Sequence, residues 1–152
     1  MSASADTLQT FLFEGHGIRG HIVQLGASWQ AVLSRHAYPP ALRDRIGELM
    51  AAAALLNATL RYRGTLSLQL QGGGPIEWLV VECSSDYGLR ATARWDGTVE
   101  YGALASQIGQ GRLVITLNPE QGDERYQAIV DAAGDTVAET LQAYFALSLI
   151  HI

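Results

Sequence analysis

The first candidate for chemistry is the stretch GHGIRG at residues 15–20, whose glycines have the G-x-G-x-x-G spacing of dinucleotide-binding loops. Such a loop binds a pyrophosphate only where a strand leads into the glycines and a helix N-terminus follows them. Here residues 6–13 carry a capping acid and apolar residues at helical spacing, which predicts a short helix, and residues 21–25 predict a strand. That order is the reverse of the nucleotide-binding one, so we interpret the glycines as a turn.

Four other groups of residues invite a chemical interpretation, and for each the pattern favours a structural one. Cys83 falls in a predicted strand with no partner thiol, which favours a buried structural cysteine. His16 and His21 have no third ligand nearby, and the glycines at 72–74 lack the lysine of a phosphate loop. The serines at 84–85 lack the glycine elbow of a hydrolase. We therefore expect no catalytic, cofactor-binding or metal site in this chain, and no enzyme activity.

Length and charge narrow the class of protein. The 152 residues fit one domain with a substantial core. A net charge of -5, with ten arginines, no lysine and no basic run, argues against nucleic acid as a partner. The most apolar stretch, residues 50–56, is too short to cross a bilayer, and no signal peptide is visible, so we expect no membrane contact and a cytoplasmic location.

The elements that must position any site follow from the hydrophobic periodicity. Pro39 and Pro40 open a long helix that reaches Leu60, and its middle is apolar all round, so it must be covered on more than one side. Strict alternation predicts an antiparallel meander, and a second hairpin follows it, which indicates an α+β fold. The other predicted elements are a helix at 28–33, strands at 65–71, 77–83 and 89–95, a helix at 103–108, strands at 112–117 and 125–130, and a last helix from Thr136.

Taken together, these segments resemble the N-terminal domain of the Hsp33 family of redox-regulated bacterial chaperones. The matching pieces run in the family's order along the chain: 11–14 (FLFE), 19–20 (RG), 55–60 (LLNATL), 68–72 (LQLQG), 74–75 (GP), 114–117 (VITL), 122, 124–127 (ERYQ) and 144–145 (YF). The resemblance implies a layered β/α/β sandwich of two mainly antiparallel sheets, with helices packed between and around them, over residues 1–146.

The resemblance also implies an activity, the ATP-independent holding of unfolded client proteins. In the family a separate C-terminal domain binds zinc through four cysteines, and a linker covers an apolar sheet surface. Oxidation of the cysteines releases the zinc, the linker unfolds and the surface becomes available. This chain stops before that domain and lacks its cysteines. Zinc is therefore expected only in the missing domain, and redox control outside this chain.

The expected client surface lies on the meander strands. Alternation places Leu66, Leu68 and Leu70 on one face of their strand, and the next strand offers apolar groups to both faces. Because the family's covering segments are absent, some of these groups should be exposed. The expected client-binding residues are Leu66, Leu68, Leu70, Trp78, Leu79, Val80 and Val81. The alternative is a dimerisation or scaffold domain, forming a homodimer, that captures clients only with the missing segments.

The last six residues, 147–152, read LSLIHI and depart from the family pattern. The common transposase sequencing adapter encodes this peptide in one reading frame. We therefore expect the tail to be non-native and exclude it from arguments about fold. A genomic stop codon directly after Ile152 would contradict this expectation.

Overall fold

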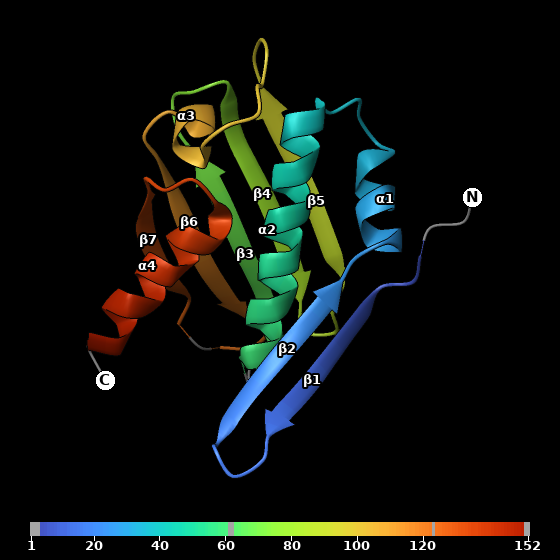
Figure 1. Ribbon diagram of the computed structural model, residues 1–152, viewed down its shortest axis with the longest axis vertical. Coiled ribbons are helices and arrows are strands. Elements are labelled where there is room, and N and C mark those ends of the chain that lie inside the picture. Colours follow the sequence, from blue (N-terminus) through green and yellow to red (C-terminus); the bar gives the residue numbers. More distant parts are fainter. Residues whose placement is uncertain (1–3, 61–62, 123, 151–152) are drawn as a thin grey trace.

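The computed structural model describes residues 4–60, 63–122 and 124–150, and its elements stack in three layers (Figure 1). An N-terminal hairpin lies across a long helix, Pro40–Thr59, and this helix lies on a five-stranded sheet. The predicted tail falls largely outside the described side chains, so its origin stays a prediction. The elements are β1 (Thr7–Phe13), β2 (Ile18–Gln24), α1 (Ala27–Leu33), α2 (Pro40–Thr59), β3 (Gly64–Gln71), β4 (Ile76–Ser84), β5 (Leu89–Trp95), α3 (Leu104–Ile108), β6 (Gly111–Pro119), β7 (Tyr126–Ala132) and α4 (Val137–Ile150).

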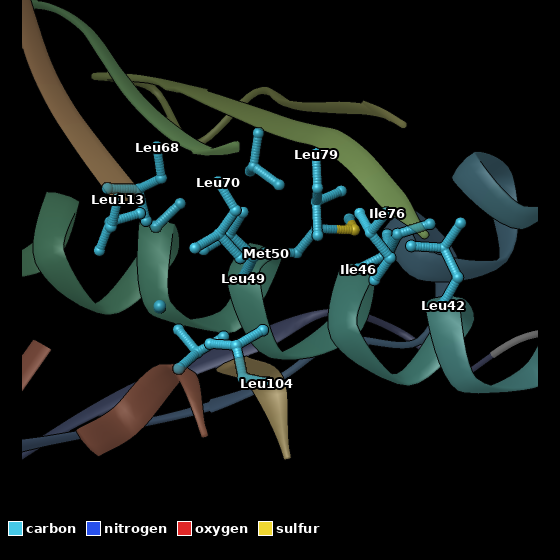
Figure 2. Close-up of a cluster of buried hydrophobic side chains, with 14 of the residues drawn as sticks. Leu42, Ile46, Leu49, Met50, Leu68, Leu70, Ile76, Leu79, Leu104 and Leu113 are labelled. Carbon is cyan, nitrogen blue, oxygen red and sulfur yellow. The ribbon is translucent and has the colours of Figure 1, made fainter. Parts of the chain in front are cut away.

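Helix α2 forms the middle layer, as its sequence predicts. Pro40 occupies the first turn, where the missing N–H costs no hydrogen bond. Leu42, Ile46 and Met50 are completely buried and point toward Leu79 and Ile76 of the sheet (Figure 2). The hairpin covers another side of the helix (Figure 1). Cover on two sides explains why the middle of α2 is apolar all round.

The five-stranded sheet has the order β5-β4-β3-β6-β7, and every neighbouring pair is antiparallel. The predicted meander and second hairpin are therefore parts of one sheet, because β3 pairs with both β4 and β6. The predicted alternation is confirmed on β3, where Leu66, Leu68 and Leu70 are buried while the residues between them are partly exposed. The predicted α+β class is also confirmed, and the second sheet is the N-terminal hairpin.

The predicted helix over residues 6–13 is wrong, because this segment is strand β1 and pairs antiparallel with β2. The turn interpretation of the glycines is confirmed, since Gly15 and Gly17 have φ angles of +78° and +62° at the tip of the hairpin. The capping acid misled the prediction. Asp6 does cap a helix, but that helix is α1, which begins some twenty residues later.

The Asp6 carboxylate joins the start of the hairpin to the start of α1. It accepts hydrogen bonds from the backbone N–H of Gly26 (2.8 Å), from that of Ser28 (3.2 Å) and from the Ser28 hydroxyl. Burial alone would raise the pKa of Asp6, but these hydrogen bonds outweigh it, and the pKa lies below its usual value. The ionised carboxylate is thus the form that stabilises this junction.

We expect Asp6→Ala to lower the free energy of unfolding by about 1 kcal/mol at neutral pH, as loss of a helix cap does. Since the folded state depresses the pKa of Asp6, its contribution is present above the unfolded pKa near 4 and is lost as pH falls through the folded value. Urea unfolding of both proteins at several pH values measures this. A difference that grows on acidification would contradict the assigned role.

The turn at residues 72–75, interpreted from sequence as a turn and not a phosphate loop, packs against the end of α3. The backbone N–H of Gly74 donates to the Ile108 carbonyl at 2.9 Å. A Cβ added at Gly74 would lie 2.6 Å from the Gln107 carbonyl oxygen, whereas one added at Gly73 would meet nothing within 4 Å. Close backbone approach therefore explains the glycine at position 74 and leaves position 73 unconstrained.

Gly74→Ala should accordingly cost about 1–3 kcal/mol of stability, the usual penalty for overpacking. Gly73→Ala is the matched control in the same turn and should lie within about 0.5 kcal/mol of the parent. Thermal or urea unfolding of the two variants provides the comparison. Equal losses at both positions would mean that the turn does not press against α3 in solution.

Candidate functional site

Five of the seven expected client-binding residues lie in the core. Leu66, Leu68, Leu79 and Val81 have no exposed surface, and Leu70 is 1% exposed. They belong to the core on the side of the sheet that packs against α2. Figure 2 shows Leu68, Leu70 and Leu79 there, together with Leu113 from β6. In this conformation these five side chains hold the sheet to the helix and offer nothing to a client.

Trp78 and Val80 lie on the opposite side of the sheet, which we call the outer face. They are partly exposed, whereas Leu79 and Val81 between and beyond them are buried. A register shift between Ile76 and Trp78 lets β4 bury Ile76 and still direct Trp78 outward. The predicted division of β4 into two apolar sides is therefore confirmed.

The outer face carries a group of apolar side chains from three strands. Val80 and Val114 both pair with Gln69 in register, and Val114 pairs with Ile129 on the edge strand β7. Ile129 is 58% exposed. We call Trp78, Val80, Val114 and Ile129 the outer cluster. Helices α1, α2 and α4 all lie on the other side of the sheet, so in the described part of the chain no helix covers this cluster (Figure 1).

Ion pairs border the outer cluster on the β5 side. Arg90 contacts Glu82 at 2.6 Å, and Arg94 contacts Glu77 at 2.8 Å. Both arginines are largely exposed, so each pair adds little stability. Their physical consequence is a polar rim beside an apolar patch, an arrangement typical of protein interaction surfaces.

A second apolar surface is the groove where the hairpin, α2 and α4 meet. It encloses about 800 Å³ and includes Arg19 and His21 of β2 at its border. Its apolar walls come from both helices and are formed by Ala51, Ala52, Leu55, Leu56, Val137, Ala138, Leu141 and Phe145. The sequence analysis assigned no client-binding residue to this groove.

Cys83 and Ser84, two of the residues first considered for chemistry, have structural contacts. Cys83 is buried, and burial, with a smaller effect of the Asp86 charge, raises the pKa of its thiol to about 11. The thiol is thus protonated at neutral pH and a poor nucleophile. Within the β4–β5 turn, the Ser84 hydroxyl donates a hydrogen bond to the Asp86 carboxylate and accepts one from the backbone N–H of Gly88. In the described part of the chain, no three His, Cys, Asp or Glu residues gather as metal ligands would.

Among the residues that the structure describes, no helix combines the length and apolar composition that a bilayer crossing requires.

Sequence reasoning missed half of the outer cluster, although a signal was present. Val114 lies in the run Leu113-Val114-Ile115, and Ile129 lies between Ala128 and Val130. Consecutive apolar residues in a strand serve both faces of a sheet. The same argument that predicted two apolar sides for β4 would have found Val114 and Ile129.

Comparison with known proteins gives consistent matches over nearly the whole chain. The protein family described as "Hsp33 protein" matches residues 6–149. The 33 kDa chaperonin of Methylobacillus flagellatus is 49% identical over 141 residues, which is 92% of this chain and 48% of that protein. The 33 kDa chaperonin of Nitrosococcus oceani is 46% identical, over 94% of this chain and 49% of its own length.

A solved structure shows the same fold. The crystal structure of the 33 kDa chaperonin from Thermotoga maritima superposes with a TM-score of 0.79 at 23% identity. The match covers 93% of this chain and 50% of that one. The chain thus spans about half the length of the relatives it matches.

Proposed function

Because this chain belongs to the Hsp33 protein family, we propose that it is the part of a chaperone that holds unfolded client proteins. Holding requires no covalent step and no nucleotide. Binding is driven by removing apolar surface from water, at about 25 cal/mol per Å². On this proposal the chain acts by binding and not as an enzyme.

The observation that carries the proposal is the outer cluster. A sheet whose inner side is fully packed normally presents polar groups to water on its other side. Here Trp78, Val80, Val114 and Ile129 keep apolar surface on that side, beside the polar Gln69 of β3. Exposed apolar patches of this kind mark interaction surfaces.

Under this proposal, the seven client-binding residues expected from sequence have two different roles. Trp78 and Val80 contact the client from the outer face. Client contact through Leu66, Leu68, Leu70, Leu79 or Val81 would require the sheet to separate from α2, so we assign these five a supporting role.

We also propose that client binding is regulated by a part of the protein outside this chain. The family resemblance suggests oxidation and zinc release in a domain beyond the half that this chain represents. Cys83 is a poor candidate for a sensor here, because its thiol is buried and protonated. We propose that the chain itself works in the cytoplasm, binds client without ATP and carries no redox switch among its described residues.

Light scattering from a thermally unfolding test protein, without ATP, tests client holding. We expect the 152-residue chain to suppress aggregation at stoichiometric ratios. Ile129→Glu should weaken suppression, since it places a charge in the outer cluster. Tyr101→Glu is the matched control, because Tyr101 is 69% exposed and lies outside the cluster. No suppression by the parent chain would refute the proposal.

The alternative function, a dimerisation or scaffold domain without client binding of its own, makes a different prediction. Analytical ultracentrifugation would then show a homodimer of this chain, and addition of an unfolded client would produce no heavier complex. Client holding predicts a heavier complex whether or not the chain dimerises.

A further inference from the structure

The N-terminal hairpin carries a third apolar surface, which is exposed on the side that faces away from α2. Phe11, Phe13, Ile18 and Ile22 are between 39% and 56% exposed, and we call these four residues the hairpin face. The register places Phe13 opposite Ile18 and Phe11 opposite Gly20. The Phe11 ring occupies the space beside Gly20, where an added Cβ would lie 2.2 Å from it. Phe11 and Phe13 also meet edge to face, with ring centroids 5.6 Å apart.

Strand β1 is an edge strand without the usual protection. It pairs with β2 on one side and with no other described strand. Its sequence, TLQTFLF, contains no charge, proline or glycine. The edge strands of the larger sheet differ, since β5 carries Arg90 and Arg94 and β7 carries Asp131. Charges on edge strands discourage pairing with another chain, so β1 is the described edge most open to an added strand.

The hairpin is also held in place before any partner arrives. Asp6 fixes the start of β1 to the N-terminus of α1, with the Gly26 N–H only 2.8 Å from its carboxylate. A strand that is already formed loses little conformational entropy when another strand joins it.

From these observations we propose that β1 binds an extended, uncharged apolar segment of an unfolding protein by strand addition. Backbone hydrogen bonds would form along the free edge of β1, and alternate side chains of the segment would lie beside Phe11 and Phe13. This inference rests on the proposed client-holding function. It adds a site that is separate from the outer cluster, because α2 and the sheet lie between the two surfaces (Figure 1).

The size of the surface favours a single extended strand over a second folded copy of this chain. Eight residues lie on the outward side of the hairpin, four of them large and apolar. A stable interface between folded proteins buries about 800 Å² per partner and uses roughly 20–30 residues on each side. All eight are uncharged, which suits a neutral partner and offers nothing to an acidic or basic one.

Binding of a labelled peptide tests this site directly. The probe is a neutral eight-residue peptide of alternating valine and threonine, and fluorescence anisotropy reports its binding to the 152-residue chain. We expect Phe13→Lys, which places a charge on β1 itself, to weaken binding at least about tenfold and Tyr101→Lys to leave it unchanged. A peptide N-methylated along one edge, which cannot donate backbone hydrogen bonds there, should lose binding to the parent chain.

The outcomes separate this inference from the proposed function. Equal affinity of the methylated and unmodified peptides, or of Phe13→Lys and the parent chain, would overturn strand addition at β1. Sedimentation as a dimer that Phe13→Lys dissociates would overturn it too, since the face would then serve a second copy. Peptide binding without suppression of aggregation would refute client holding while supporting the site. Phe13→Ser replaces Phe13→Lys if circular dichroism shows that the latter does not fold.

Discussion

Leu68→Ala is expected to lower the free energy of unfolding by about 2–5 kcal/mol. Leu68 has no exposed surface and lies on the central strand β3, among the core residues between the sheet and α2 (Figure 2). Truncation removes buried apolar atoms and leaves a cavity that the packed neighbours fill only in part. Urea unfolding followed by tryptophan fluorescence measures the loss.

Val80→Ala is the control on the other side of the same sheet. Val80 lies on β4, directly beside β3, but faces outward and is only partly buried, so its truncation should cost at most about 1 kcal/mol. Because both residues were expected from sequence to bind clients, the pair separates a structural role from a binding role. Similar losses for both variants would contradict the division of the sheet into a packed and an uncovered side.

The same pair distinguishes stability from client holding. At a temperature where both variants remain folded, we expect Leu68→Ala to suppress aggregation as the parent does, and Val80→Ala to suppress it less well. This contrast follows from burial alone, since a side chain with no exposed surface cannot contact a client. Under the proposed function, the two faces of this sheet therefore have different roles.

The sequence predicts the strands of the large sheet well because their alternation is strict. Leu66, Leu68 and Leu70 repeat every second residue, and only a strand places such residues on one side. Which side a given strand buries is not encoded locally. It depends on where α2 packs and on the pairing of β3 with β6, which brings together residues some fifty positions apart.

The hairpin shows why local patterns can fail. Residues 6–13 combine a capping acid with apolar residues at positions 8, 11 and 12, and both features occur at helix starts. The acid instead caps α1, and the apolar residues divide between the two sides of β1. A cap can come from a distant segment, so the residue type alone does not identify the helix that it serves. Because a helix was predicted here, the sequence analysis did not identify Phe11 and Phe13 as exposed aromatic residues of a strand. Strand addition depends on these two residues.

The burial of Arg45 also could not be predicted from the sequence. On α2 it resembles any other arginine of an amphipathic helix, yet it is only 7% exposed. Its guanidinium donates to the Gln107 side chain (2.6 Å) and to the carbonyls of Gly102 (2.8 Å) and Asp135 (3.0 Å). It also pairs with Glu48 at 3.1 Å. One side chain thus joins α2 to α3 and to the loop that precedes α4.

Arg45→Met is therefore expected to lower the free energy of unfolding by about 3 kcal/mol or more. The variant keeps an apolar stem but leaves the buried Gln107 side-chain oxygen and the partly buried carbonyls of Gly102 and Asp135 without this donor. A buried acceptor without a donor costs about 1–3 kcal/mol. Arg45→Lys should recover only part of the loss, because an ammonium group cannot reproduce the planar fork of donors. The control is Arg90→Met, whose exposed ion pair with Glu82 is worth at most about 1 kcal/mol.

The loss of stability in Arg45→Met should appear first as local opening at the start of α4. Glu48, which Arg45 holds, accepts a hydrogen bond from the backbone N–H of Val137 at 3.3 Å, and Val137 is the first residue of that helix. Hydrogen exchange should therefore quicken at residues 135–141 in Arg45→Met more than in β3. If exchange rose equally in both elements, or if Arg45→Met cost no more than Arg90→Met, Arg45 would not be the residue that fixes α4. Because α4 is also a wall of the apolar groove, its position decides how much of that groove remains open.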